Sequence, residues 1–333
     1  MKTTSVLIQS LCAPCFCRCR YCLLSWDGKP VGAEWSRSVR LAERFIKELK
    51  EQAPDIKSSF SFGYSMEHPD LKGALRTLRR LGSPTADFLQ CDGMKMRDER
   101  ECAELAGMLL SEGVKELNFT VYGLAEYHDR FAGRKGDFEL ILRMMAAARN
   151  AGLYFTVGVP LTGGNIEQTD KVVNVLKAAG CGKIRLFIPH GEGRGKSISE
   201  IRLRKSEFER ISPENRGLLN GEIYKTEGEW LVEPEPVRDE NRMILLSLRA
   251  DNIDGYEKRG ALSVIAEIEK LDEEYYGAFP TFKELTQLYG DKNGDKMYRI
   301  RDLYHHYRTR YAQEHKISVY DVTDERQSGS RRY

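Results

Sequence analysis

The start of the chain decides the fold, because an apolar segment, Ser5-Val-Leu-Ile8, leads within four residues into Cys12-Ala-Pro-Cys15-Phe-Cys17-Arg-Cys19-Arg-Tyr-Cys22. The apolar and β-branched residues of the first segment predict a buried strand. Five of the eight cysteines of the 333-residue chain lie in the eleven residues from Cys12 to Cys22. In a reducing compartment, cysteines at two- and three-residue intervals hold metal more often than they form disulfides. The sequence therefore predicts a metal-binding loop directly after the first strand.

Strand and helix patterns alternate over the next 180 or so residues. Between the strands, apolar residues recur at helical spacing, as at Leu71, Leu75 and Leu78. Such an alternation predicts parallel strands joined by right-handed crossovers, in a barrel or an open wound sheet. Six units would make a partial barrel, short of the eight that close a full one. The fold class is therefore α/β, and the expected strands are 5–8, 58–62, 86–90, 116–121, 154–159 and 183–188.

Beyond Gly191 the pattern changes to a smaller α+β region. We expect a strand pair around 222–232, a further strand at 243–248, and helices at 262–275, 281–289 and 296–311. Thr281 and Glu284 fit a capping box at the start of the second of these helices. The predicted organisation is a barrel domain at 1–195, an α+β region at 196–323 and a flexible tail at 324–333.

Composition excludes several classes of protein. The chain has 52 basic and 50 acidic residues, and binding to nucleic acid or to an anionic membrane needs a clustered positive excess. The longest uncharged runs, 3–17 and 151–166, are too short and too polar to cross a bilayer as helices. No export signal forms at the N-terminus, because the apolar stretch breaks at Gln9. We therefore expect a cytoplasmic protein.

Three of the cysteines, Cys15, Cys19 and Cys22, have the spacing CxxxCxxC. Thiolates at this spacing on a non-helical loop can each bind one iron of a cubane cluster, which leaves the fourth iron open for a substrate or cofactor. A non-enzymatic zinc module is an alternative, but only three residues separate Cys12-x-x-Cys15 from Cys19-x-x-Cys22, whereas a zinc ribbon has about 15 to 20. An iron–sulfur electron carrier would want a fourth cysteine, such as Cys12 or Cys17, yet has no need of six β/α units.

This loop, with Tyr21 directly before the third cysteine, resembles the radical S-adenosylmethionine (radical SAM) superfamily. The resemblance implies a partial (β/α)6 TIM-like barrel, a [4Fe-4S] cluster on Cys15, Cys19 and Cys22, and S-adenosylmethionine on the fourth iron. It implies an oxidoreductase or modifying enzyme in which a 5'-deoxyadenosyl radical abstracts hydrogen from a peptide or small-molecule substrate. An electron donor such as flavodoxin or ferredoxin is the implied partner. No cysteine follows Cys181, so the auxiliary clusters of SPASM-type members are not expected.

The ends of the second and third strands carry further candidates. Ser65-Met66-Glu67 is similar to a degenerate form of the family's GGEP segment, which contacts the methionine part of S-adenosylmethionine. A helix N-cap by Glu67 or Asp70 is the simpler interpretation of the same stretch. After the third strand, Cys91 is a candidate hydrogen donor to a substrate radical, although a small buried packing residue is the commoner role of a free cysteine.

The later strands supply the remaining expected cofactor contacts. Tyr21 of the cysteine loop is also expected to contact the cofactor. Asn118 and Thr120 alternate with apolar residues, so both face the barrel interior, where the resemblance implies contact with S-adenosylmethionine. Asn165 is either a helix cap or a neighbour of the ribose. Arg194 lies in a glycine-rich stretch similar to the family's PxGRG segment and could pair with a carboxylate. For His128, a role at the site and a surface position with its hydrogen bonds satisfied are equally good interpretations.

A basic and aromatic stretch near the C-terminus raises a third function, nucleic-acid modification. Its tyrosines and arginines, from Tyr298 to Tyr311, fall at helical spacings, which more often indicates an amphipathic core helix. We therefore favour the radical SAM interpretation, with a non-enzymatic zinc or iron–sulfur module as the alternative.

Overall fold

The structure is a computed structural model. It describes residues 3–11, 14–22, 32–63, 66–189, 198–219, 223–232, 242–320 and 326–328. Of the residues singled out above, Cys12, Ser65 and Arg194 lie outside the described residues, and so does most of the glycine-rich stretch around Arg194.

All six strands that the sequence predicts are present, and each is followed by one or more helices. Glycines end several of these helices, as at Gly152 after α5 and Gly180 after α6, where φ is 83° and 87°. The bounds are β1 (Thr3–Ser10), α1 (Trp35–Gln52), β2 (Lys57–Phe62), α2 (Leu71–Arg80), η1 (Pro84–Ala86), β3 (Phe88–Gln90), α3 (Glu99–Ser111), β4 (Glu116–Thr120), α4 (Ala125–Ala132), α5 (Asp137–Ala151), β5 (Tyr154–Pro160), η2 (Ile166–Gln168), α6 (Thr169–Ala178) and β6 (Lys183–Phe187).

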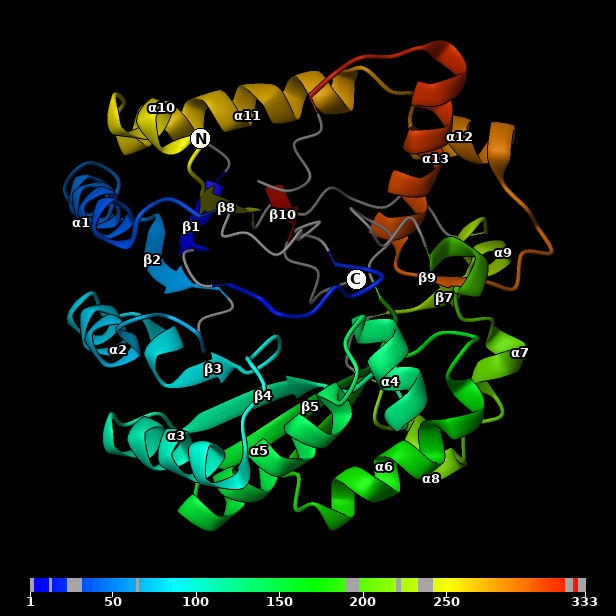
Figure 1. Cartoon of the computed structure of the whole chain (residues 1–333). Coiled ribbons are helices and arrows are strands. Elements are labelled where there is room, and N and C mark those ends of the chain that lie inside the picture. Colours follow the sequence, from blue (N-terminus) through cyan, green and yellow to red (C-terminus); the bar gives the residue numbers. More distant parts are fainter. Residues whose placement is uncertain are drawn as a thin grey trace.

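The strands of these units are parallel, as predicted. Strand β1 pairs with β2, and β3, β4, β5 and β6 form a second ladder in that order. Figure 1 shows the strands as a curved row with α1, α2, α3 and α5 on its outer side. The ladder is interrupted between β2 and β3 in the described part of the chain. The α/β fold class is confirmed, and the carboxyl ends of the parallel strands meet at one edge, where ligands bind in such folds.

One strand from the C-terminal half joins this sheet. Strand β8 (Arg242–Leu248), expected as part of the α+β region, runs parallel to β1 with Leu245 opposite Leu7. Strand β1 is therefore an internal strand, and the cysteine loop leaves the sheet between two neighbours. Part of the tail expected to be flexible forms β10 (Arg326–Ser328), because its backbone pairs antiparallel with the other edge of β8.

The strand pair expected around 222–232 is wrong for the residues that the structure describes there. Only β7 (Lys225–Thr226) is a strand, and it pairs with β9 (Met297–Tyr298). The next four residues form helix α9 (Glu227–Trp230), because Thr226 and Glu229 make a capping box that starts a helix. A local capping signal therefore overrides the β-propensity of the stretch.

The expected C-terminal helices are all present. The capping box at Thr281 is confirmed, since Thr281 N donates to Glu284 Oε2 at 2.8 Å and Glu284 N to Thr281 Oγ1 at 3.3 Å. Among the described helices, none combines the length and the apolar character needed to cross a membrane. The remaining elements are α7 (Lys205–Phe208), α8 (Pro213–Arg216), α10 (Ile253–Glu257), α11 (Ala261–Gly277), α12 (Phe282–Tyr289) and α13 (Ile300–His315).

The pairing of β8 with β1 is testable by stability. Leu246 of β8 is fully buried opposite Ile8 of β1. Replacing it with alanine leaves a cavity in the core, so we expect Leu246→Ala to lower the free energy of unfolding by about 2–5 kcal/mol. Urea denaturation measures this loss against the control Val232→Ala, whose side chain is 84% exposed. An equal, small effect of both substitutions would contradict the placement of β8 in the core.

Candidate functional site

The cysteine loop is fixed by backbone hydrogen bonds to two other segments. One is the turn after β3, and the other is the end of α4, so the loop bridges neighbouring β/α units at the carboxyl ends of their strands. It therefore has a defined position without needing regular structure of its own. The hydrogen bonds join Phe16 N to Gly93 O (2.9 Å), Arg18 N to Ala132 O (2.6 Å) and Arg20 N to Phe131 O (3.1 Å).

Two glycines permit this close approach. Gly93 has φ of 72°, and a Cβ atom there would lie 2.2 Å from Cys15 Sγ. Gly133, directly after α4, has φ of 68°, and its Cβ would lie 2.8 Å from Arg18 Cβ. At both places the backbone conformation and the lack of space require a residue without a side chain.

Burial separates the cysteines of the loop into two kinds. Cys15, Cys19 and Cys22, the three of CxxxCxxC, are half-buried, whereas Cys17 is buried. Hydrogen bonding to Cys15 and Cys19, together with burial, holds the pKa of the Cys17 thiol far above its usual value. The same contact with Cys17 lowers the pKa of Cys15, which favours the thiolate that a metal ligand needs.

The donor set fits an iron–sulfur cluster. Three half-buried thiols come from one short loop, and the glycine at position 93 leaves Cys15 Sγ room that a side chain would fill. Across the described residues, no three histidine, cysteine, aspartate or glutamate side chains converge on a point that could hold a single metal ion. A cubane has no such requirement, because each thiolate binds a different iron.

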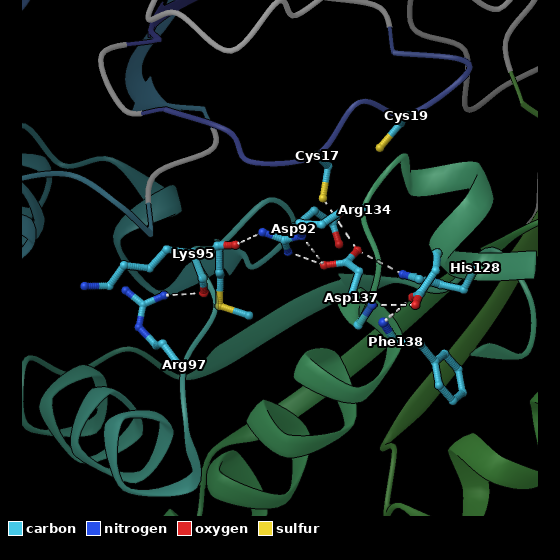
Figure 2. Close-up of polar contacts among 12 residues, drawn as sticks. Cys17, Cys19, Asp92, Lys95, Arg97, His128, Arg134, Asp137 and Phe138 are labelled. Carbon is cyan, nitrogen blue, oxygen red and sulfur yellow. Dashed lines mark hydrogen bonds and ion pairs between the residues drawn. The ribbon is translucent and has the colours of Figure 1, made fainter. Parts of the chain in front are cut away.

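A buried carboxylate, Asp137, lies under the loop and is bound by three residues (Figure 2). Cys17 Sγ donates to its Oδ2 at 3.5 Å, and His128 Nε2 lies 3.0 Å from the same atom. Arg134 binds its Oδ1 through two guanidinium nitrogens and also donates to the Met94 carbonyl. Burial opposes ionisation of Asp137, but the hydrogen bonds from His128 and Arg134 outweigh it and lower its pKa.

The histidine of this cluster has a defined tautomer. Tyr122 N donates to His128 Nδ1 at 3.1 Å, so the proton is on Nε2, which donates to Asp137. His128 is fully buried inside α4, and its interpretation as a surface residue is therefore wrong. The neighbouring Asp129 accepts from the backbone nitrogens of Gly136 (2.5 Å) and Phe138 (2.9 Å), at the start of α5.

Aromatic rings enclose the loop on its inner side. Tyr122 Oη donates to Cys19 Sγ at 3.1 Å. The ring of Tyr21 packs against Tyr122 and Phe131, with both centroid distances at 5.8 Å. Burial, more than the neighbouring thiols and carboxylate, raises the pKa of the Tyr21 phenol. These rings keep water from one side of the cysteine sulfurs, and a contact of Tyr21 with a cofactor stays a prediction.

Glu67, expected to bind the cofactor, is engaged by an arginine. Arg97 contacts its two oxygens at 2.5 and 3.0 Å, and Lys95 N donates at 3.0 Å. The cap of α2 is Asp70, whose Oδ1 accepts from Gly73 N at 2.9 Å. Of the two simple interpretations of this stretch, the cap by Asp70 is therefore the one observed.

Cys91 and Met66 lie together in the core. Cys91 is fully buried, with its sulfur 4.0 Å from Met66 Sδ and 3.6 Å from the Leu89 carbonyl oxygen. Burial raises the pKa of the Cys91 thiol well above its usual value. These contacts are those of a packing residue, and the role of hydrogen donor stays a prediction.

Thr120 of β4 binds the carboxylate of Asp92, which is not among the site residues predicted from the sequence. Asp92, two residues after β3, accepts from Thr120 N at 2.8 Å, from Thr120 Oγ1 at 2.7 Å and from Gln90. Burial raises its pKa to about 6, although these hydrogen bonds oppose the rise. Asn118 lies two residues before Thr120 and donates to Thr156 Oγ1 at 2.8 Å. The position of Asp92 after a predicted strand was the signal that could have identified it.

Asn165 joins the ends of β4 and β5. Its Nδ2 donates to the carbonyl oxygens of Tyr122 and Pro160, both at 2.7 Å, and its Oδ1 accepts from Thr162 N at 2.8 Å. Asn165 is the N-cap residue of η2, but its side chain makes no capping hydrogen bond there. Its contact with a ribose stays a prediction. Neither Asp137 nor Arg134 carries a sequence signal, because their importance depends on which segments meet at the loop.

A parallel β/α barrel with a CxxxCxxC loop after its first strand defines a class of iron–sulfur proteins. The family model described as the radical SAM superfamily matches residues 13–178, and the chain belongs to this superfamily. The cofactors of this superfamily are a [4Fe-4S] cluster and S-adenosylmethionine.

The chain is also similar to individual proteins. It is 21% identical over 210 residues to the AdoMet-dependent heme synthase of Nitratidesulfovibrio vulgaris (strain Hildenborough), covering 63% of this chain and 54% of that protein. The chain thus matches about half the length of this relative. Among solved structures, SuiB of Streptococcus suis bound to the precursor peptide SuiA has 11% identity and a TM-score of 0.45, covering 64% of this chain and 46% of that one. Coproporphyrinogen III oxidase (HemN) of Escherichia coli has 14% identity and a TM-score of 0.36, covering 56% and 44%.

Substitution of Gly93 tests the close approach at Cys15. We expect Gly93→Ala to reduce the iron bound after anaerobic reconstitution several-fold, because the new methyl group occupies the space of Cys15 Sγ. Gly82→Ala is the matched control, since Gly82 has a similar φ of 67° with nothing within 4 Å. Equal iron binding by the two variants would show that the contact with Cys15 Sγ does not limit iron binding.

The raised pKa of Asp92 predicts a pH dependence of stability. The folded protein keeps this proton up to about pH 6, whereas the unfolded chain releases it near the ordinary value of 3.8. Stability therefore falls as pH rises from about 4 to 6, by an amount of order 3 kcal/mol for this group. Urea unfolding of the metal-free protein across this range should show the fall in the wild type and a smaller one in Asp92→Asn. The exposed Asp55→Asn is the control, and a variant at Asp92 with the wild-type pH profile would contradict the assignment.

Proposed function

We propose that the protein is a radical SAM enzyme in which Cys15, Cys19 and Cys22 bind the cluster. The main support for this proposal is the cysteine loop. Its three half-buried thiols follow an internal strand of a parallel sheet, and its backbone is bound to the segments after β3 and in α4. When bound, the cluster would supply an electron that cleaves S-adenosylmethionine to a 5'-deoxyadenosyl radical.

The chain's own residues hold the loop and shield it. Cys17 is buried and donates to Asp137, which attaches the loop to the core. Tyr122 donates to the sulfur of Cys19, and hydrogen bonds to cluster sulfurs tune the reduction potential. We place the contacts with S-adenosylmethionine at Asn118 and Thr120 of β4, together with Met66, Glu67 and Asn165.

A cavity next to the loop is the proposed place for part of the substrate. Its volume is about 180 Å³, and it lies between the ends of β5 and β6 on one side and α13 on the other. Ile198 lines the cavity and packs in the same apolar cluster as Cys15 and Cys19. Its lining mixes apolar with polar groups, which suits a peptide side chain or a small molecule; it includes Leu161, Ile188, Tyr298, His306 and Thr309.

Substrate class and compartment follow from the same proposal. The comparisons include both a precursor-peptide complex and a heme synthase, and the mixed lining of the cavity is compatible with either kind of substrate. A thiolate cluster needs a reducing compartment, so we place the protein in the cytoplasm, with a flavodoxin or ferredoxin as electron donor.

Cysteine substitutions test the assignment. Reconstituted wild-type protein should hold about four iron and four sulfide and release 5'-deoxyadenosine when dithionite and S-adenosylmethionine are added. Cys15→Ala, Cys19→Ala and Cys22→Ala should each abolish that release, because a missing ligand detaches one iron. Cys181→Ala, at a half-buried cysteine outside the loop, should behave as wild type.

Two results would contradict the proposal. One is a folded protein that binds zinc but no iron–sulfur cluster, as the alternative non-enzymatic module would. The other is a loaded cluster that never cleaves S-adenosylmethionine under reducing conditions.

A further inference from the structure

The outer side of the cysteine loop is part of an exposed surface that the proposed function does not explain. Two large apolar side chains are exposed there, Phe16 of the loop (45%) and Met96 of the segment before α3 (50%). Arg18, Lys95 and Lys135, also exposed, are on the same three segments. We call these five residues the loop-side face.

The segments that carry the loop-side face are in direct contact. Phe16 N donates to the carbonyl of Gly93, two residues before Lys95. The turn 133–136, which contains Lys135, packs on both other segments: a Cβ at Gly133 would lie 2.8 Å from Arg18 Cβ, and a Cβ at Gly136 would lie 3.4 Å from Met96 Cε. The five residues therefore belong to one continuous surface.

Within the part of the chain that the structure describes, the positive charges of this face have no ion-pair partner. Among the described residues, no carboxylate forms an ion pair with Arg18, Lys95 or Lys135; the Arg18 guanidinium donates to the carbonyls of Cys15 and Cys17 instead. Three carboxylates that contact these segments are engaged by other groups. Glu67 is bound by Arg97, Asp137 is bound by Arg134 and His128, and Asp129 accepts from the start of α5.

This arrangement differs from the rest of the surface near the site. Arg20 pairs with Glu200 at 3.3 Å and Arg130 with Glu126 at 3.8 Å, so neighbouring cations do have partners. The whole chain carries a net charge of only +2. The unpaired cations are therefore a local feature, and they surround exposed apolar groups, as at sites of transient protein association.

We propose that the loop-side face docks an acidic protein that donates single electrons, of flavodoxin or ferredoxin type. The inference rests on the proposed function, because it requires a cluster on the loop. Phe16 directly follows Cys15, so a partner seated here is adjacent to a cluster ligand. The donor gives up one electron and is oxidised, and the cluster accepts that electron and is reduced. No bond forms or breaks in this step. Charge steers the encounter, and Phe16 and Met96 supply the apolar contact.

The test compares two reductants of the same reconstituted holoenzyme. Reduced flavodoxin must dock, whereas dithionite is small and needs no docking surface. The double variant Lys95→Glu/Lys135→Glu should slow reduction by flavodoxin about tenfold at low salt and flatten its dependence on salt. Release of 5'-deoxyadenosine with dithionite should stay at the wild-type rate.

A matched control carries the same change in net charge elsewhere. Lys171→Glu/Lys283→Glu alters two exposed lysines, on α6 and α12, and should leave flavodoxin reduction within about twofold of wild type. A second variant, Met96→Ala, should slow reduction by flavodoxin without changing the salt dependence, because it removes apolar contact and no charge.

The outcomes separate this inference from the proposed function. If flavodoxin reduces the Lys95/Lys135 variant and the control variant at the same rate, the docking proposal fails while turnover with dithionite still supports the enzyme. If the variant also loses turnover with dithionite, the face binds an acidic substrate or supports the cluster itself, and the docking proposal is again overturned. Failure of the wild type to cleave S-adenosylmethionine with dithionite would instead remove the proposed function.

Discussion

The structure depends on the way the cysteine loop is attached. Three backbone hydrogen bonds bind a segment without regular structure to the turn after β3 and to the end of α4. Backbone contacts of this kind specify position without specifying side chains, so the loop's side chains remain available for chemistry. Gly93 and Gly133 are required because the loop approaches the backbone more closely than a Cβ allows. The backbone that carries the three thiols of CxxxCxxC is therefore held in place by its contacts with the turn after β3 and with α4.

The buried hydrogen-bond network around Asp137 also holds the cysteine loop in place. A lone buried carboxylate is costly, and this one is stabilised by Arg134, by the Nε2 proton of His128 and by the thiol of Cys17. The partners come from the cysteine loop, from α4 and from the turn before α5. Removing any one of them would leave the others with an incompletely satisfied buried group. Cys17 thus has a structural role, distinct from that of Cys15, Cys19 and Cys22.

The sequence was most informative where the signal is local. Strand and helix periodicity located all six β/α strands, and spacing alone separated Cys15, Cys19 and Cys22 from Cys17. The pairing of β8 with β1 could not be predicted, because it joins segments more than 230 residues apart. For the same reason the sequence did not identify Asp137, whose burial depends on distant segments, whereas Asp92 could have been identified by its position after a predicted strand. At Thr226 the local capping box outweighs the β-propensity of the stretch, so a helix forms where a strand pair was predicted.

We propose that three cysteines of this loop hold a cluster with one iron left open for S-adenosylmethionine. Mössbauer spectroscopy of the ⁵⁷Fe-reconstituted protein tests it most directly, since it observes the irons themselves. We expect a [4Fe-4S] spectrum in which, on addition of S-adenosylmethionine, the signal of one iron of the four separates from that of the other three. A spectrum that S-adenosylmethionine leaves unchanged, or the absence of any iron–sulfur signal from folded protein, would contradict it.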